Sequence, residues 1–76
     1  MSILPILAAR VVISALLRAG FVILRQKGSH VFLKNPLTGK VTSVPLHTKD
    51  LTRGLLTAII KQAGLTVQQF LRLLKK

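Results

Sequence analysis

Apolar residues recur at every third or fourth position near the start of the chain, which is the spacing of one helix face. Pro5 suits a first helical turn, because its missing N–H is not needed there, and Gly20 supplies a left-handed end. We therefore predict a helix over residues 5–19. Its expected buried face is Ile6, Ala9, Ile13, Leu16 and Leu17. Four further apolar residues lie off this face: Leu7, Val11, Val12 and Ala15. This apolar surplus is expected either to pack on the other helices or to form an exposed surface that binds a partner.

Short runs rich in β-branched and aromatic residues follow this helix, and they predict strands. The dipeptide Lys27-Gly28 and the loop Asn35–Gly39 contain residues typical of turns, so each is expected to join neighbouring strands as a hairpin. The expected strands are Phe21–Gln26, His30–Lys34 and Val41–Val44, the last of them ended by Pro45.

The last third of the chain predicts two helices in succession. The first is expected to begin near Asp50, capped by Thr48 or by Asp50 itself, and to end at Gly64. The second begins with Thr66 and Gln69 in the form of a capping box. The expected buried face of the first is Leu51, Leu55, Ala58 and Ile59, and that of the second is Val67, Phe70, Leu71 and Leu74.

The order of elements, α-β-β-β-α-α, predicts an α+β fold. A three-stranded antiparallel sheet needs one face covered, so we expect a two-layer sandwich with helices on one face. Residues 1–76 are expected to form a single domain, because a chain this short has only a limited core. The double-stranded-RNA-binding domain (dsRBD) has the same order of elements, although a shared fold alone does not establish a function.

Twelve lysines and arginines against one acid give the chain a net charge of +11. Such a surface attracts polyanions. The candidate partners are therefore nucleic acid, an anionic membrane or an acidic protein. The apolar N-terminal stretch carries Arg10 in its middle, unlike a signal peptide or a membrane span. We therefore expect a cytoplasmic protein with no membrane partner. A membrane-active basic protein is the weakest alternative, because strands and turns interrupt the chain.

The reactive side chains exclude most classes of enzyme. One carboxylate cannot form the acid pair of a glycosidase or a magnesium cluster. Two histidines without cysteine fall short of a zinc site, so no metal or other cofactor is expected. Histidine with cations does suffice for RNA cleavage by the RNA's own 2′-hydroxyl, because imidazole exchanges protons near neutral pH and cations stabilise the phosphorane. A purely structural histidine is the alternative.

Five short motifs follow one another along the chain. They are Ala19-Gly20-Phe21, Arg25-Gln26-Lys27-Gly28-Ser29-His30, Val44-Pro45-Leu46-His47, Gly54-Leu55-Leu56 and Ile60-Lys61-Gln62-Ala63-Gly64-Leu65. This succession resembles the HicA (YcfA-like) family of mRNA-interferase toxins, over about residues 16–74. No motif is specific by itself, and the resemblance rests on their common order and spacing.

The resemblance implies a dsRBD-like fold and an endoribonuclease that cuts mRNA. It implies that His30 is catalytic and that a cognate HicB-type antitoxin covers the active surface. His47 matches a second family histidine, whose role is open between an acid/base group, an RNA contact and a helix-entry residue. The first helix departs from the family, because small and apolar residues stand where charged ones are usual. An oligomer formed through this helix or through the antitoxin is therefore an open alternative.

The neighbours of His30 each have two interpretations. Arg25 and Lys27 alternate onto one strand face and either bind phosphate or form a solvated edge. Gly28 is expected to permit a tight turn and close approach of RNA. Ser29 orients His30, contacts phosphate or stabilises the turn. The remaining cations are expected to act as a general electrostatic footprint: Lys34, Lys40, Lys49, Arg53, Lys75 and Lys76.

The expected function is that of a toxin of a type II toxin–antitoxin system. It would cleave mRNA without a metal, with His30 as general acid or base. The alternative is a non-catalytic RNA-binding module of dsRBD type, which rests on the charge and the order of elements alone.

Overall fold

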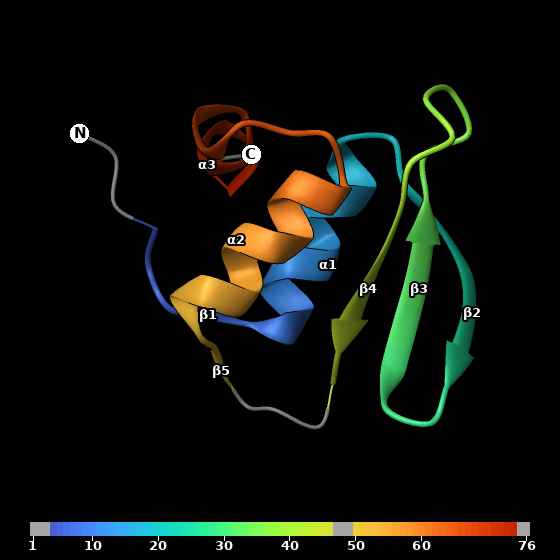
Figure 1. Cartoon of the computed structure of the whole chain (residues 1–76), viewed down its shortest axis with the longest axis horizontal. Coiled ribbons are helices and arrows are strands. Elements are labelled where there is room, and N and C mark those ends of the chain that lie inside the picture. Colours follow the sequence, from blue (N-terminus) through green and yellow to red (C-terminus); the bar gives the residue numbers. More distant parts are fainter. Residues whose placement is uncertain (1–3, 47–49, 75–76) are drawn as a thin grey trace.

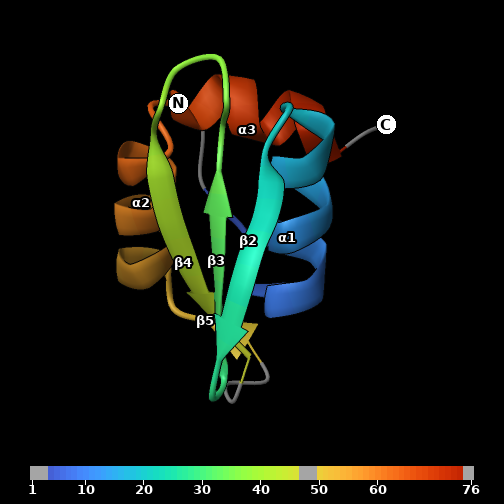
Figure 2. The same cartoon turned by 90° about the vertical axis from the view of Figure 1, so that its right-hand side faces the viewer.

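The computed structural model describes residues 4–46 and 50–74. The main strands are β2 (Val22–Lys27), β3 (His30–Lys34) and β4 (Val41–Pro45), and the helices are α1 (Ala9–Arg18), α2 (Arg53–Gln62) and α3 (Val67–Leu74). The strands form one antiparallel sheet in the order β2-β3-β4, and the helices lie on one side of it (Figure 1). Turning the molecule by 90° brings the uncovered side of the sheet to the front (Figure 2). The predicted α+β fold is therefore confirmed.

The three strands follow the predicted hairpins closely. β3 has the expected bounds, β4 includes Pro45, and β2 begins one residue later than expected. Phe21 stays outside β2 because its backbone N–H donates to the carbonyl of Leu16 and so closes the end of α1. Gly20, with φ of 100°, adopts the left-handed conformation that this helix end requires.

A bulge in β2 changes which side chains share a face. Ile23 is paired with Leu33, but Arg25 is paired with Phe32, so Leu24 is an extra residue opposite the regular β3 ladder. Ile23 and Arg25 would share a face in a regular strand, because side chains alternate with a period of two. The bulge instead turns Arg25 to the face opposite Leu33, and the next paired residues continue in that phase.

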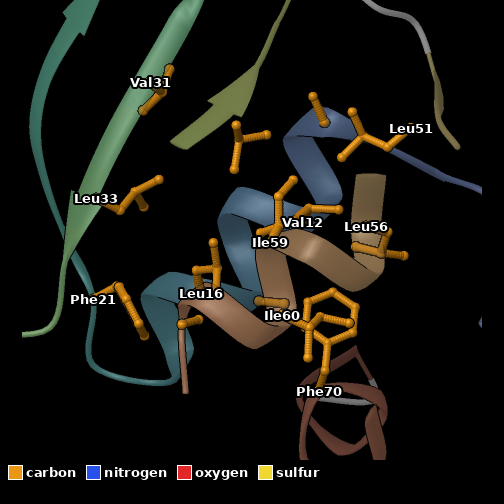
Figure 3. Packing of buried hydrophobic residues seen from close by; sticks show 14 of the residues in the cluster. Val12, Leu16, Phe21, Val31, Leu33, Leu51, Leu56, Ile59, Ile60 and Phe70 are labelled. Atoms are coloured by element: carbon orange, nitrogen blue, oxygen red, sulfur yellow. The ribbon is translucent and has the colours of Figure 1, made fainter. Parts of the chain in front are cut away.

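The core lies between the sheet and the helices (Figure 3). Val31, Leu33 and Val44 contribute from the sheet, and Phe70 contributes from α3. The buried residues of α1 and α2 also belong to it: Ala9, Val12, Ala15, Leu16, Leu56, Ile59 and Ile60. Leu4, Phe21, Leu51 and Ala63 complete it. Because Val31 and Leu33 alternate with exposed or half-buried neighbours along β3, only one face of the sheet is part of the core.

The predicted buried face of the first helix was partly wrong. Ile6 and Leu17, expected to be buried, are 58% and 44% exposed. Val12 and Ala15, from the surplus apolar set, are fully buried, as the alternative of packing on other elements predicts. Only Arg10, Ser14 and Arg18 are polar in this helix, so apolar residues occupy much more than one face and their period does not fix which of them are buried. Packing against β4 and α3 decides the orientation. Val11, from the same surplus set, is 43% exposed, so the two interpretations of this set apply to different residues.

The predicted start of the first helix was also wrong. Residues Leu7–Ala8 form a short strand, β1, which pairs antiparallel with β5 (Asp50–Leu51), and α1 begins only at Ala9. The Arg53 Nε–H donates to the carbonyl of Leu4 at 2.8 Å, which ties the N-terminal segment to α2. These contacts between distant parts of the chain hold residues 7–8 extended, despite a proline well placed to start a helix.

The second helix begins later than predicted. Asp50 lies in β5, and Thr52 is the cap, because its hydroxyl accepts a hydrogen bond from the Leu55 N–H at 3.2 Å. Thr48, the other candidate, lies outside the described residues. Leu55 and Ala58 were expected to be buried and are exposed, because the helix turns the face with Leu56, Ile59, Ile60 and Ala63 to the core.

The third helix has the predicted capping box. The Gln69 N–H donates to the Thr66 hydroxyl at 3.0 Å, and the Thr66 N–H donates to the Gln69 side-chain oxygen at 2.9 Å. The helix packs on α1 and α2, and Arg18 donates to the carbonyl of Leu73 at 2.8 Å. Phe70 is fully buried, and the other expected apolar residues are half-buried: Val67, Leu71 and Leu74.

Candidate nucleic-acid interface

The sheet face away from the helices, which we call the open face, carries three of the site residues predicted from the sequence, namely Arg25, Lys27 and His30. Side chains of directly paired residues point to the same face of an antiparallel sheet. His30, Phe32 and Lys34 alternate with the buried residues of β3, so they and their partners lie on the open face. The partners form three rows: Val22–Lys34–Val41, Arg25–Phe32–Ser43 and Lys27–His30–Pro45.

His30 lies at the first position of β3 and is exposed. Lys27 is its direct partner on β2, and Pro45 is its partner on β4. The Cβ atoms of such pairs lie about 4.5–5.5 Å apart, so the ammonium group of Lys27 can reach a ligand held by His30. The sheet thus brings a proton-exchanging group and a cation together on a surface open to a large ligand.

Arg25 lies in the neighbouring row. Its guanidinium carbon is 5.2 Å from the centre of the Phe32 ring, which is the distance of a cation–π contact. Adjacent rows are separated by two residues, or about 7 Å along the strand. Arg25 and Lys27 therefore lie on the same face, as their spacing predicts, and their pairing with Phe32 and His30 puts that face opposite the helices.

The turn Gly28-Ser29 joins Lys27 directly to His30. Gly28 has φ of 59°, whereas Ser29, like every non-glycine residue in 4–46 and 50–74, does not have positive φ. Gly28 therefore occupies the first central position of a type II′-like hairpin turn. A Cβ atom at Gly28 would meet no atom within 4 Å, which leaves room for a ligand near this backbone. Ser29 is half-buried, and its carbonyl accepts a hydrogen bond from the N–H of Leu46. This bond ties the turn to the end of β4.

Three of the other basic residues have a defined place in the fold or on the open face. Arg18 and Arg53 donate to main-chain carbonyls within the fold, so Arg53 does not act only as a general footprint. Lys34 lies on the open face with Arg25 and Lys27, and no acidic side chain occurs in the three rows. The structure does not describe His47, Lys49, Lys75 and Lys76. The open face is therefore a one-sign cationic surface around His30.

The described residues contain no group of three or more His, Cys, Asp or Glu side chains that could hold a metal ion. Within residues 4–46 and 50–74, no helix is long and apolar enough to cross a membrane. The open face offers a ligand an imidazole, cations, the Ser43 hydroxyl, backbone groups of a tight turn and one aromatic ring.

The comparison with protein families decides the identity of the chain. Residues 9–65, which are more than half of the chain, match the family model described as HicA toxin of bacterial toxin–antitoxin systems. The chain belongs to the HicA toxin family. No curated protein sequence matches it. A HicA toxin works with a cognate antitoxin, so the chain is the toxin member of such a pair. The matched segment includes the whole β2-β3-β4 sheet and His30.

Sequence reasoning did not single out Phe32 or the bulge at Leu24. Phe32 stands midway between His30 and Lys34, and the period of two predicts that all three share a face. This signal was present in the sequence. The bulge has no such signal, because Val22, Ile23 and Leu24 are equally suited to either face of a strand.

Proposed function

We propose that this HicA toxin is a metal-independent endoribonuclease that cleaves mRNA, with His30 as its general acid or base. The observation that carries the proposal is the pairing of His30 with Lys27 on the cationic open face. RNA presents a phosphate and a 2′-hydroxyl to any surface that binds its backbone. A histidine next to cations supplies what cleavage at that phosphate requires.

The proposed reaction is an internal transesterification. A base removes the 2′-hydroxyl proton, the 2′-oxygen forms a bond to phosphorus, and the bond to the 5′-oxygen of the next nucleotide breaks. An acid gives that leaving oxygen a proton, so the products are a 2′,3′-cyclic phosphate and a free 5′-hydroxyl. His30 takes one of these two roles, and Arg25 and Lys27 bind the phosphate and stabilise the extra negative charge of the phosphorane.

The turn residues support the same site. Gly28 brings backbone into reach of RNA, because nothing lies where its side chain would be. Ser29 positions the turn or contacts phosphate. His47 is the candidate second acid/base group, and Leu46, the residue before it, is hydrogen-bonded to Ser29. A His47→Ala variant distinguishes the three possible roles of this residue. A lower kcat would indicate proton transfer, and a higher KM would indicate an RNA contact. A lower stability would indicate a helix-entry residue.

The proposed partners follow from the same surface. The substrate is mRNA, which we expect the toxin to meet in the cytoplasm. The partner that inhibits it is a HicB-type antitoxin that covers the open face, and a higher-order assembly would form through that antitoxin or through the first helix.

The test is His30→Ala, assayed for RNA cleavage in EDTA and for growth inhibition in cells. We expect cleavage to fall by at least about 10²–10⁴-fold, because one acid/base group contributes that much. His30 is exposed, so the free energy of unfolding should change by no more than about 0.5 kcal/mol. Full cleavage by a folded variant would overturn the assignment. RNA binding with no cleavage by the parent protein would support the non-catalytic module instead.

A further inference from the structure

One phenylalanine is placed differently from the other two. The chain has three phenylalanines, no tyrosine and no tryptophan. Phe21 and Phe70 are 2% and 0% exposed, so they serve the core. Phe32 is only half-buried, and it lies on the open face, in the middle of the sheet. An aromatic ring at that position is not explained by core packing, since the core is on the other face.

The surroundings of Phe32 fit a nucleobase. Arg25 contacts the ring from β2, and its planar guanidinium can stack on a base as well as bind phosphate. The row of His30 and Lys27 is the next one along the sheet, about 7 Å away. A nucleotide that lies across the two rows would have its phosphate at His30 and its base at Phe32.

A shallow hollow extends from Phe32 across β4 to α2. Its volume is about 510 Å³, and its lining includes Ser43, Lys40 and Gln62. The Gln62 carbonyl oxygen accepts a hydrogen bond from the buried Thr42 hydroxyl at 2.9 Å, which fixes the amide and leaves its NH₂ group as a donor. The hollow therefore offers a base edge polar partners beside an aromatic ring.

We infer that the open face binds single-stranded RNA, with one unpaired nucleobase stacked on Phe32 and its edge in this hollow. The inference rests on the proposed function, since it names the substrate class of the same site. Bases in a duplex are stacked on their neighbours and present no free ring, whereas an unpaired base can stack on an aromatic side chain. With one aromatic ring, the face holds one base, and Phe32 is a binding and specificity-determining residue next to His30.

The test measures binding without cleavage. The full chain is titrated with a short single-stranded RNA whose 2′-hydroxyls are methylated, and the dissociation constant is read from fluorescence anisotropy. Phe32→Leu keeps an apolar side chain and removes the ring, so we expect single-strand binding to weaken by roughly 5- to 150-fold. Phe32→Tyr keeps the ring and should bind within about twofold of the parent. The matched control is Leu37→Ala, which removes a 92% exposed apolar side chain at the far hairpin and should also leave binding unchanged.

A second measurement ties Phe32 to a base. RNAs that lack one base at successive positions are bound to the parent and to Phe32→Leu. We expect one position where base removal weakens binding to the parent and has no effect on the variant, which is the signature of a direct contact in a double-mutant cycle. Equal binding of single strands by the parent and Phe32→Leu would overturn the inference, as would equal affinity for duplex RNA.

These outcomes differ from those of the His30 test. If cleavage depends on His30 but Phe32→Leu binds normally, the proposed function stands and the inference fails. If the parent protein binds single strands through Phe32 but never cleaves RNA, the inference stands and the proposed function fails. Thermal unfolding of each variant by circular dichroism ensures that binding is compared between folded proteins.

Discussion

The two faces of the sheet contain neighbouring residues of the same strands, yet they have opposite characters. Val31 and Leu33 are 4% and 0% exposed on the covered face, whereas His30 and Lys34, one residue away, are exposed on the open face. The difference follows from the two-residue period of a strand, because each face receives every second side chain. One short strand therefore supports the core and the candidate site together, and substitutions on the two faces should have separable effects.

The largest expected effect is on the covered face. Leu33→Ala removes a fully buried side chain and should lower the free energy of unfolding by about 2–5 kcal/mol. That is a large part of the roughly 4–11 kcal/mol expected for a domain of 76 residues. Urea unfolding measures it. Lys34→Ala, the next residue on the open face, is the control and should change stability by less than about 0.5 kcal/mol. Similar losses in both variants would contradict the division between the faces.

The next effect is on the open face and concerns affinity. Replacing Arg25 and Lys27 together by alanine should weaken binding of single-stranded RNA on the order of tenfold at 0.1 M salt. The slope of log K against log salt should become shallower by about 1.4, because two phosphate contacts are lost. Stability should fall by less than about 1 kcal/mol, through loss of the Arg25–Phe32 contact. Lys61→Ala, on α2, removes a cation elsewhere and should leave the slope unchanged. An unaltered slope in the double variant would refute the phosphate contacts.

The smallest effect concerns the turn that joins the two strands. Gly28→Ala forces a left-handed conformation on alanine, at a cost of roughly 1–2 kcal/mol. The lower entropy of the unfolded chain offsets part of this, so a net loss of about 1 kcal/mol is expected in thermal unfolding. Gly54→Ala in α2 is the matched control, because neither site has an atom within 4 Å of the added Cβ and Gly54 lacks the positive φ. Gly54→Ala should stabilise the protein slightly, and a change of the same sign in both variants would rule out backbone strain as the cause.

Local signals in the sequence predicted much of the fold. The bounds of β3, the glycine at the end of α1 and the capping box of α3 depend on residues close together in the chain, and all were predicted correctly. The errors at the start of α1 and α2 have a common origin. Residues 7–8 and 50–51 pair with each other as β1 and β5, and no local pattern reveals a pairing between segments this far apart.

The candidate site was predictable in its residues but not in its geometry. Arg25, Lys27, Gly28, Ser29 and His30 are adjacent in sequence, so their proximity follows from the chain itself. The face of the sheet that they occupy does not follow from the sequence alone. It depends on the pairing of Arg25 and Lys27 with β3 and on the burial of Val31 and Leu33 against the helices. Phe32 was not predicted as a site residue, because a phenylalanine in a strand is as well suited to the core as to a binding surface until the face on which it lies is known.

The sequence by itself determined the order of elements, the cationic character and the membership of His30 in a tight hairpin, because periodicity, charge and turn chemistry are local properties. Only the tertiary structure decided which faces of α1 and α2 are buried, since both helices are apolar on more than one side. It also decided that the face shared by His30 and Phe32 is the open one, and that Lys27 lies on it beside His30. Strand register is a relation between segments, and burial of Val31 and Leu33 against the helices selects the register that leaves these three side chains outside.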